Sequence, residues 1–214
     1  MKKLDIYYED KSILVVNKPS KLLTISTQKN NNSLYNEVYD YLHKKNQKCF
    51  IVHRLDKDTS GLIIFAKNEK CKLFLQDNWD KVKRKYVAVV QGEVKKGGII
   101  ESYLKETKTL FTYSSNDKVK GKYACTVYEP LVTNKAYSLL DILIKTGRKN
   151  QIRVHLNDIG HPIIGDKKYG ASKNPISRLG LHAYYLEFNH PVSKENMVIK
   201  TSFPKEFEKI FEKK

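Results

Sequence analysis

Short apolar runs bounded by turn-forming residues set the main constraint on the fold of this chain. Most are four to eight residues long and rich in β-branched side chains, which is typical of buried strands rather than of helices. We expect strands at 12–17, 51–52, 62–65, 86–90, 181–188 and 197–201, and a β meander over 99–145 whose longest apolar run is 137–144. A chain built from these runs folds around at least one sheet.

Helical periodicity is confined to a few separate segments. We expect helices over 34–45 after a Ser33 cap, over 70–79, within 147–157 and after Pro204. Gly160 is placed to end the third of these helices in a left-handed cap. Strands predominate, and the helices are dispersed without regular βαβ alternation. The pattern predicts a single domain of the α+β class.

Length and composition exclude several classes of protein. The 214 residues suit one domain, and no apolar run approaches the length of about eighteen residues that a membrane span needs. The start of the chain reaches Asp5 where a signal peptide would place its apolar stretch, so we expect a cytoplasmic protein. The three cysteines lack the spacing of a disulfide framework or a zinc knuckle.

The net charge indicates a polyanionic partner. The chain carries 40 Lys and Arg against 23 Asp and Glu, a formal charge of +17 at pH 7. Such an excess favours binding to nucleic acid through phosphate neutralisation. Because only five of the basic residues are arginines, a solvated lysine-rich surface without a partner remains an alternative.

A dense polar cluster, residues 53–61, lies between two of the expected strands. Its sequence is HRLDKDTSG, and a polar segment flanked in this way emerges from a sheet where a carboxylate can lie against a low-dielectric wall and a guanidinium. Asp56 is therefore a candidate nucleophile or base. The alternative is that Asp56 and Asp58 only form turn hydrogen bonds, with 59–61 as the turn.

A second polar cluster, residues 146–156, surrounds the start of the third expected helix. Arg148 and Arg153 stand near helix-start amides, an arrangement that can bind phosphate, although an ordinary charged helix start is the alternative. Arg153 lies between Ile152 and Val154, where a partly buried arginine requires a carboxylate partner. The six histidines show no metal-ligand spacing, and no nucleotide-binding glycine motif occurs, so neither a metal nor an organic cofactor is expected.

Four segments in order resemble one known family. They are HRLDKDTSGLIIFAK, KYVAVVQG, TGRKNQIRVHL with IGHPIIGDKKYG, and RLGLHAYYLEFNHP. In this order and at these separations they are similar to the RluA-type pseudouridine synthases, from about Asp5 to Pro204. The resemblance implies an isomerase that detaches uracil from its ribose within RNA, turns the base and rejoins it through carbon 5. It also implies that the reaction needs no metal or cofactor.

The resemblance assigns roles to individual residues. Asp56 matches the catalytic aspartate, Tyr86 the tyrosine that lies against the flipped base and handles the carbon 5 proton, and Arg153 the arginine that pairs with the catalytic carboxylate. Arg54 matches the arginine that fills the space of the extruded nucleotide. RNA binding is assigned to Arg54, Thr59, Arg148 and Lys149. From the residue alone, a core strand tyrosine is the better interpretation of Tyr86, because tyrosine is common in strands.

The family comparison completes the expected organisation. We expect residues 1–214 to form one catalytic domain without a separate amino-terminal RNA-binding domain, with a mixed, largely antiparallel central sheet flanked by helices and loops and a catalytic cleft across it. The expected partner is ribosomal or transfer RNA, and the expected state is a monomer. Lys149-Asn150 and Ser20-Lys21 depart from the usual family residues near the expected RNA path.

Several alternatives stay open at this point. A non-catalytic RNA chaperone on the same scaffold is one, and a glycoside hydrolase that uses Asp56 and Asp58 is another. The sequence does not specify which uridine is modified, nor whether Asp56 attacks the sugar or the base.

Overall fold

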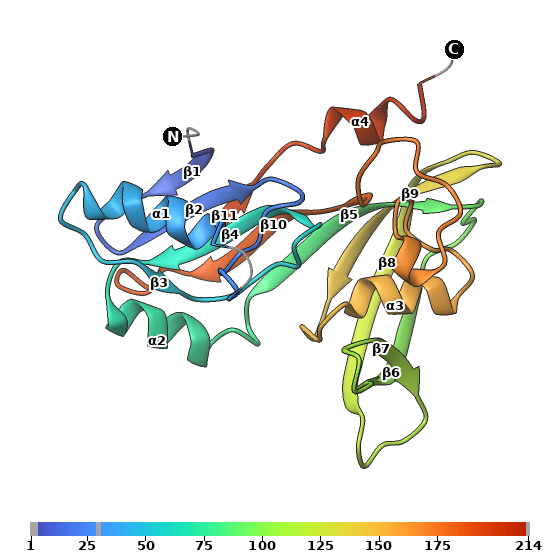
Figure 1. The fold of residues 1–214 in the computed structure, drawn as a ribbon, viewed down its shortest axis with the longest axis horizontal. Helices are drawn as coiled ribbons and strands as arrows, with labels where there is room; N and C mark the ends of the chain where they lie inside the picture. The colour runs from blue at the N-terminus through green and yellow to red at the C-terminus, as the bar shows by residue number, and fades with distance from the viewer. Residues whose placement is uncertain (1–3, 29–30, 213–214) are drawn as a thin grey trace. The chain divides into compact units, whose positions relative to one another are not determined.

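The structure, a computed structural model, describes residues 4–28 and 31–212 (Figure 1). The chain divides into two compact units. The first consists of the described residues up to Lys83 together with Ala183–Ser202, and the second of Arg84–His182 together with the described residues from Phe203 onward.

The first unit is built on strands in the order β1-β2-β4-β10. In addition, β3 pairs with β4, and β11 pairs with β10. The elements are β1 (Ile6–Glu9), β2 (Ile13–Lys18), α1 (Leu34–His43), β3 (Phe50–Ile51), β4 (Ser60–Ala66), α2 (Glu69–Asp77), β10 (Leu181–Asn189) and β11 (Asn196–Lys200). The pairs β1/β2, β2/β4, β3/β4 and β10/β11 are antiparallel.

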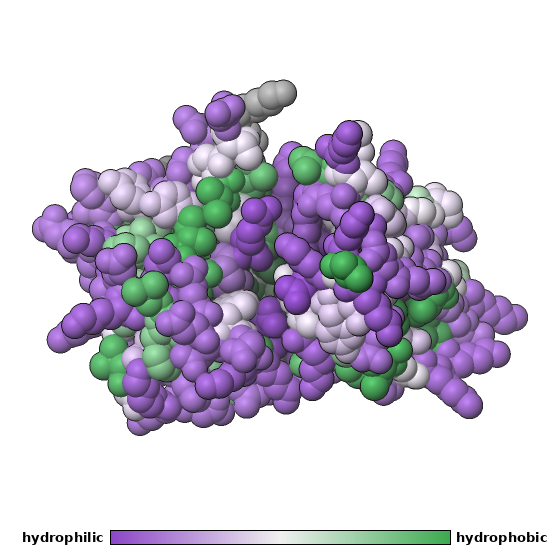
Figure 2. Space-filling model, turned by 90° about the horizontal axis from the view of Figure 1, so that it is seen from below, coloured by the Kyte–Doolittle hydropathy of each residue, from purple (hydrophilic) through white to green (hydrophobic). Residues whose placement is uncertain are grey.

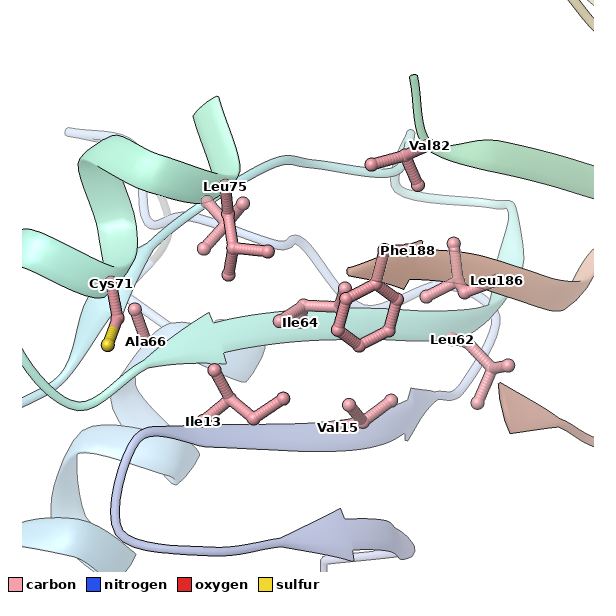
Figure 3. Packing of buried hydrophobic residues seen from close by; sticks show 11 residues of the cluster. Ile13, Val15, Leu62, Ile64, Ala66, Cys71, Leu75, Val82, Leu186 and Phe188 are labelled. Atoms are coloured by element: carbon pink, nitrogen blue, oxygen red, sulfur yellow. The ribbon is translucent and has the colours of Figure 1, made fainter. Parts of the chain in front are cut away.

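Alternating side chains of β2 and β4 build the core of the first unit. In the register of these strands Val15 lies opposite Ile64, and both point to the side on which α2 packs Cys71 and Leu75 (Figure 3). All seven residues of β4 are buried, and its apolar run is uninterrupted over 62–66. Helix starts follow the sequence: the Ser33 hydroxyl accepts a hydrogen bond from the backbone N–H of Asn36 at 3.3 Å and caps α1.

The second unit is built on strands in the order β5-β9-β8-β6-β7. All four of these pairings are antiparallel. The elements are β5 (Lys83–Gln91), β6 (Gly98–Glu106), β7 (Thr112–Ser115), β8 (Lys122–Thr133), β9 (Tyr137–Ile144), α3 (Gln151–Asp158), the 3-10 turn Lys167–Tyr169 and α4 (Lys205–Glu208). The buried side chains of β5 and β9 pack against Ile152 and Leu156 of α3.

The expected fold class is confirmed, because largely antiparallel strands predominate and helices and loops flank them. The expected β meander over 99–145 is wrong. Strand β6 lies between β7 and β8, and Tyr103 stands opposite Ser115 on one edge and Tyr123 on the other. The reason is that β7 folds back on one edge of β6, whereas the turn after it carries the longer β8 to the opposite edge.

Strand β1, with the sequence IYYE, was not expected, because it is short and has no uninterrupted apolar run. Among residues 4–28 and 31–212 no helix is long and apolar enough to cross a membrane, and the longest, α1, has ten residues. The single catalytic domain over 1–214 and the cleft across the sheet stay predictions.

Candidate active site

The loop that carries Asp56 connects β3 to β4 in the first unit. Leu55 is buried and points into the core, so its two neighbours point outward: Arg54 is exposed and Asp56 is half-buried. Thr59 is buried, and its backbone N–H donates to the carbonyl of Asp56 at 3.2 Å, which closes the turn after the aspartate. The structure therefore holds Arg54, Asp56 and Thr59 in one loop.

Side chains from other elements fix the backbone of this loop before Asp56. The Nε2 atom of His53 accepts a hydrogen bond from the backbone N–H of Ile64 at 3.0 Å, and its ring stacks on Trp79 with 4.3 Å between centroids. The Thr24 hydroxyl donates to the carbonyl of Leu55 at 2.7 Å and accepts from its N–H at 3.2 Å. Because these contacts hold both His53 and Leu55, the backbone that leads into Asp56 has little freedom.

A fully buried lysine fixes the loop beyond Asp56. The Nζ atom of Lys18 donates to the carbonyls of Pro19 at 3.0 Å, Leu22 at 2.7 Å and Lys57 at 3.0 Å. The Ser20 hydroxyl donates to the carbonyl of Asp58 at 2.7 Å, so one of the residues that depart from the family pattern contacts this loop. Sequence reasoning missed Lys18; the only signal is a lysine that ends an apolar strand directly before a proline.

Replacing Lys18 with methionine is expected to destabilise the protein by about 3 kcal/mol, because three carbonyls lose the ammonium group that satisfies them. Urea denaturation measures the change in the free energy of unfolding. Lys11→Met, at an exposed position just before β2, is the control and is expected to stay within about 0.5 kcal/mol of the wild type. Equal stability of the two variants would contradict the assignment.

Tyr86 lies on β5 in the second unit. It stands opposite Ile142 of β9, is half-buried, and packs against the apolar cluster of this unit. Arg84 points to the same side two residues earlier. Burial lowers the pKa of Arg84 below its usual value, and neighbouring Tyr86 partly opposes this effect. Tyr86 thus stands at the margin of the core, next to a buried guanidinium.

Helix α3, which carries Arg153, is anchored to β8 by two buried polar side chains. The Nε2 atom of Gln151 donates to the carbonyl of Cys125 at 3.0 Å and to the Thr126 hydroxyl at 2.9 Å. The ring nitrogens of His155 lie 2.9 Å from the hydroxyls of Thr126 and Ser102, and burial lowers its pKa. These bonds fix the rotation of α3 and hence the direction of Arg153.

The guanidinium of Arg153 has a carboxylate partner within the second unit. Its Nε and Nη2 atoms donate to the two carboxylate oxygens of Asp166, at 2.7 and 2.8 Å, and its Nη1 atom donates to Oδ1 of Asn150 at 2.8 Å. The expectation that Arg153 requires a carboxylate is met by Asp166, to which sequence reasoning gave no role. The pairing of Arg153 with Asp56 stays a prediction.

Arg148 and Lys149 are exposed at the start of α3. The Arg148 Nε atom donates to the carbonyl of Tyr123 at 2.9 Å, and Lys149 forms an ion pair with Glu106. The N–H of Arg148 donates to the Gln151 side chain at 3.0 Å, so this amide is already used within the chain. Asn150 has a φ of 55°, a left-handed conformation that asparagine tolerates better than most residues. The RNA-binding roles of Arg148 and Lys149 stay predictions.

The stability of the protein is expected to fall below pH 6.5 because of His182, on β10. Burial, with a smaller contribution from Arg178, lowers the pKa of His182 to about 4. The folded state thus binds its proton more weakly than the unfolded state, whose histidine titrates near 6.5, so the stabilisation is complete above 6.5 and is lost as the pH falls towards 4. The loss amounts to about 3 kcal/mol.

Urea denaturation at pH 7 and pH 4.5 measures this dependence. His182→Gln removes the titrating group, so its free energy of unfolding is expected to change less between the two pH values than that of the wild type. Exposed His43 on α1 provides a matched control, because His43→Gln is expected to keep the wild-type dependence. An unchanged pH dependence in His182→Gln would contradict the expectation.

Comparisons with known proteins identify a family model and relatives that match this chain. The family model described as RNA pseudouridylate synthase matches residues 12–158. The tRNA pseudouridine synthase C of Haemophilus ducreyi is 30% identical over 97% of this chain and 94% of its own length. The ribosomal large subunit pseudouridine synthase D of Haemophilus influenzae is 33% identical over 95% of this chain and 68% of its own length.

A solved structure shows the same fold. The human RNA pseudouridylate synthase domain containing 4 matches 95% of this chain and 90% of its own chain with a TM-score of 0.80 at 22% identity. The family model covers the segment with Asp56, Tyr86 and Arg153, the residues on which the resemblance depends. The chain belongs to the RluA-type RNA pseudouridine synthases, a family of isomerases.

Proposed function

We propose that this protein converts specific uridines in structured ribosomal or transfer RNA to pseudouridine. The observation that carries the proposal is the Asp56 loop. Hydrogen bonds of Thr24, Lys18 and His53 hold the backbone on both sides of its half-buried carboxylate. Family membership gives this arrangement its chemistry, and relatives named for ribosomal and transfer RNA supply the substrate class.

In the proposed reaction Asp56 is the nucleophile. The bond between N1 of uracil and C1′ of ribose breaks, the base turns, and a new bond joins C5 to C1′ and frees Asp56. The proton on C5 is released to a base, and N1 takes up a proton. Tyr86 stacks on the uracil and handles that proton, and Arg153 keeps the carboxylate of Asp56 ionised by pairing with it.

RNA reaches the catalytic residues through the basic surface. Hydrophilic side chains cover most of the face that Figure 2 shows, and the formal charge of +17 attracts RNA in a salt-dependent way. Arg54 fills the space of the flipped nucleotide and offsets part of the cost of unstacking it, which is a few kcal/mol. Thr59, Arg148 and Lys149 contact the RNA near it. We propose a cytoplasmic monomer that works without a metal or an organic cofactor.

Release of tritium from carbon 5 tests the proposal. Purified protein is incubated with transfer and ribosomal RNA labelled with tritium at carbon 5 of uridine, and both released tritium and free uracil are measured. We expect tritium release without free uracil. Free uracil would indicate a glycoside hydrolase, and RNA binding without tritium release would indicate a non-catalytic chaperone; either outcome contradicts the proposal.

A further inference from the structure

We propose that Asp166 and Tyr169 are positioning residues for Arg153: together they hold its guanidinium by one edge and one face in the direction that pairing with the catalytic carboxylate requires. The inference rests on the proposed function and extends it to residues outside the expected catalytic set. Arg153, Asp166 and Tyr169 all belong to the second unit.

The hydrogen bonds of Arg153 define the direction of its guanidinium plane. Two parallel bonds from Nε and Nη2 to the carboxylate of Asp166, at 2.7 and 2.8 Å, leave the group no freedom to rotate about its own axis. A third bond, from Nη1 to Asn150 at 2.8 Å, fixes the opposite side. Of the five N–H donors of an arginine, these contacts use three.

Burial makes this ion pair a fixed part of the unit. Asp166 is 2% exposed, and the side chain of Arg153 is 11% exposed. Leaving a carboxylate buried to this degree without hydrogen bonds is costly, and Arg153 supplies two such bonds. A lysine in place of Arg153 provides one point charge and no fork, so it does not reproduce the orientation.

Tyr169 holds the face of the same guanidinium. The Cζ atom of Arg153 lies 4.8 Å from the centroid of the Tyr169 ring, which is buried. The ring is itself fixed, because its hydroxyl accepts a hydrogen bond from the backbone N–H of Thr112 at 3.3 Å and the ring stacks on Phe111 at 5.0 Å. The Tyr169 ring is thus held by β7 and the loop that precedes it.

This arrangement affects catalysis more than binding. A carboxylate nucleophile is correctly oriented only if the orientation of its cationic partner is fixed. Small misplacements of a catalytic group reduce rates strongly. Asp166 and Tyr169 are buried and contact Arg153, and they are not proposed to contact RNA. Their loss is therefore expected to lower kcat while the KM for RNA stays the same.

The first test compares Asp166→Asn with wild type in the tritium-release assay. We expect kcat to fall about 10- to 100-fold with KM unchanged, as for other residues that orient a catalytic ligand. Asp141→Asn, which breaks the 2.6 Å ion pair of Asp141 with Lys85 in the same unit, is the matched control and is expected to keep wild-type kcat. A normal kcat in Asp166→Asn would overturn the proposal.

A double-mutant cycle separates positioning from simple structural support. If Asp166 acts through Arg153, then Asp166→Asn has little further effect on kcat in an Arg153→Lys background. An equal loss of kcat in both backgrounds would overturn the proposal. Tyr169→Leu and Tyr169→Phe add an independent pair. The first removes the ring and is expected to lower kcat several-fold, whereas the second keeps the ring face but loses the hydrogen bond to Thr112 and is expected to lower kcat less.

A readout without substrate keeps this inference distinct from the proposed function. The chain has only five arginines, so the Nε–H signal of Arg153 can be assigned by NMR with the Arg153→Lys variant. We expect slow exchange of this proton with water in the wild type and fast exchange in Asp166→Asn. Fast exchange in the wild type would overturn the positioning role of Asp166. Slow exchange in a wild type that releases no tritium would overturn the proposed function alone.

Discussion

Replacing Asp56 with asparagine is expected to lower tritium release by at least about a thousandfold, because an amide of the same shape lacks the negative charge of the carboxylate and cannot attack uridine as a nucleophile. The fold should be unaffected, since the hydrogen bonds that hold the loop come from residues around Asp56: Thr24, Ile64 and Lys18. Thermal unfolding and RNA binding of the variant are therefore expected to match the wild type.

Asp58 offers a matched control in the same loop. It is exposed, and the bond that involves it in the structure runs to its backbone carbonyl from Ser20. Asp58→Asn is expected to retain activity within a few-fold of the wild type. If both variants lost activity to the same extent, the two carboxylates would act together as in a glycoside hydrolase, and the role of Asp56 as sole nucleophile would be wrong.

Replacing Gly61 with alanine is expected to cause a large loss of stability. Gly61 has a φ of 126°, and a Cβ atom there would lie 2.2 Å from the carbonyl oxygen of Ala183 on β10. Backbone atoms cannot move aside as a flexible side chain can. We expect a loss of about 4 kcal/mol or more, which lowers the melting temperature by about 10 °C.

Gly160, after α3, is the control for the conformational part of this effect. Its φ of 80° is equally unusual for other residues, but a Cβ atom there would have nothing within 4 Å. Gly160→Ala is expected to cost only about 1 kcal/mol. Thermal unfolding of both variants measures the difference, and equal losses would show that the close approach to Ala183 is not the cause.

The elements that depend on local sequence were predictable. Ser33 caps α1, Gly160 takes the left-handed conformation that ends α3, and 137–144 is β9, because each signal lies within a few residues of the element it sets. The order of β6, β7 and β8 was not predictable, because it depends on pairings between distant residues. The turn read at 59–61 is in part a strand: β4 begins at Ser60, since Gly61 pairs with Lys18.

The candidate site shows the same division. The motif around Asp56 identified the family, and the burial of Arg153 between apolar neighbours correctly implied a carboxylate partner. The partner's identity, Asp166, lies 13 residues further along the chain and becomes visible only when the turn after α3 folds back on it. Lys18 was missed because a lysine in a strongly basic sequence reads as surface charge, whereas here three carbonyls hold it in the core.

Mapping of pseudouridines in RNA from a strain that lacks this gene, after incubation with the purified protein, tests the central claim most directly. The account predicts that wild-type protein converts one or a few defined uridines in ribosomal or transfer RNA, and that Asp56→Asn converts none of them. Conversion of the same uridines by Asp56→Asn, or the absence of any new pseudouridine with the wild type, would contradict it.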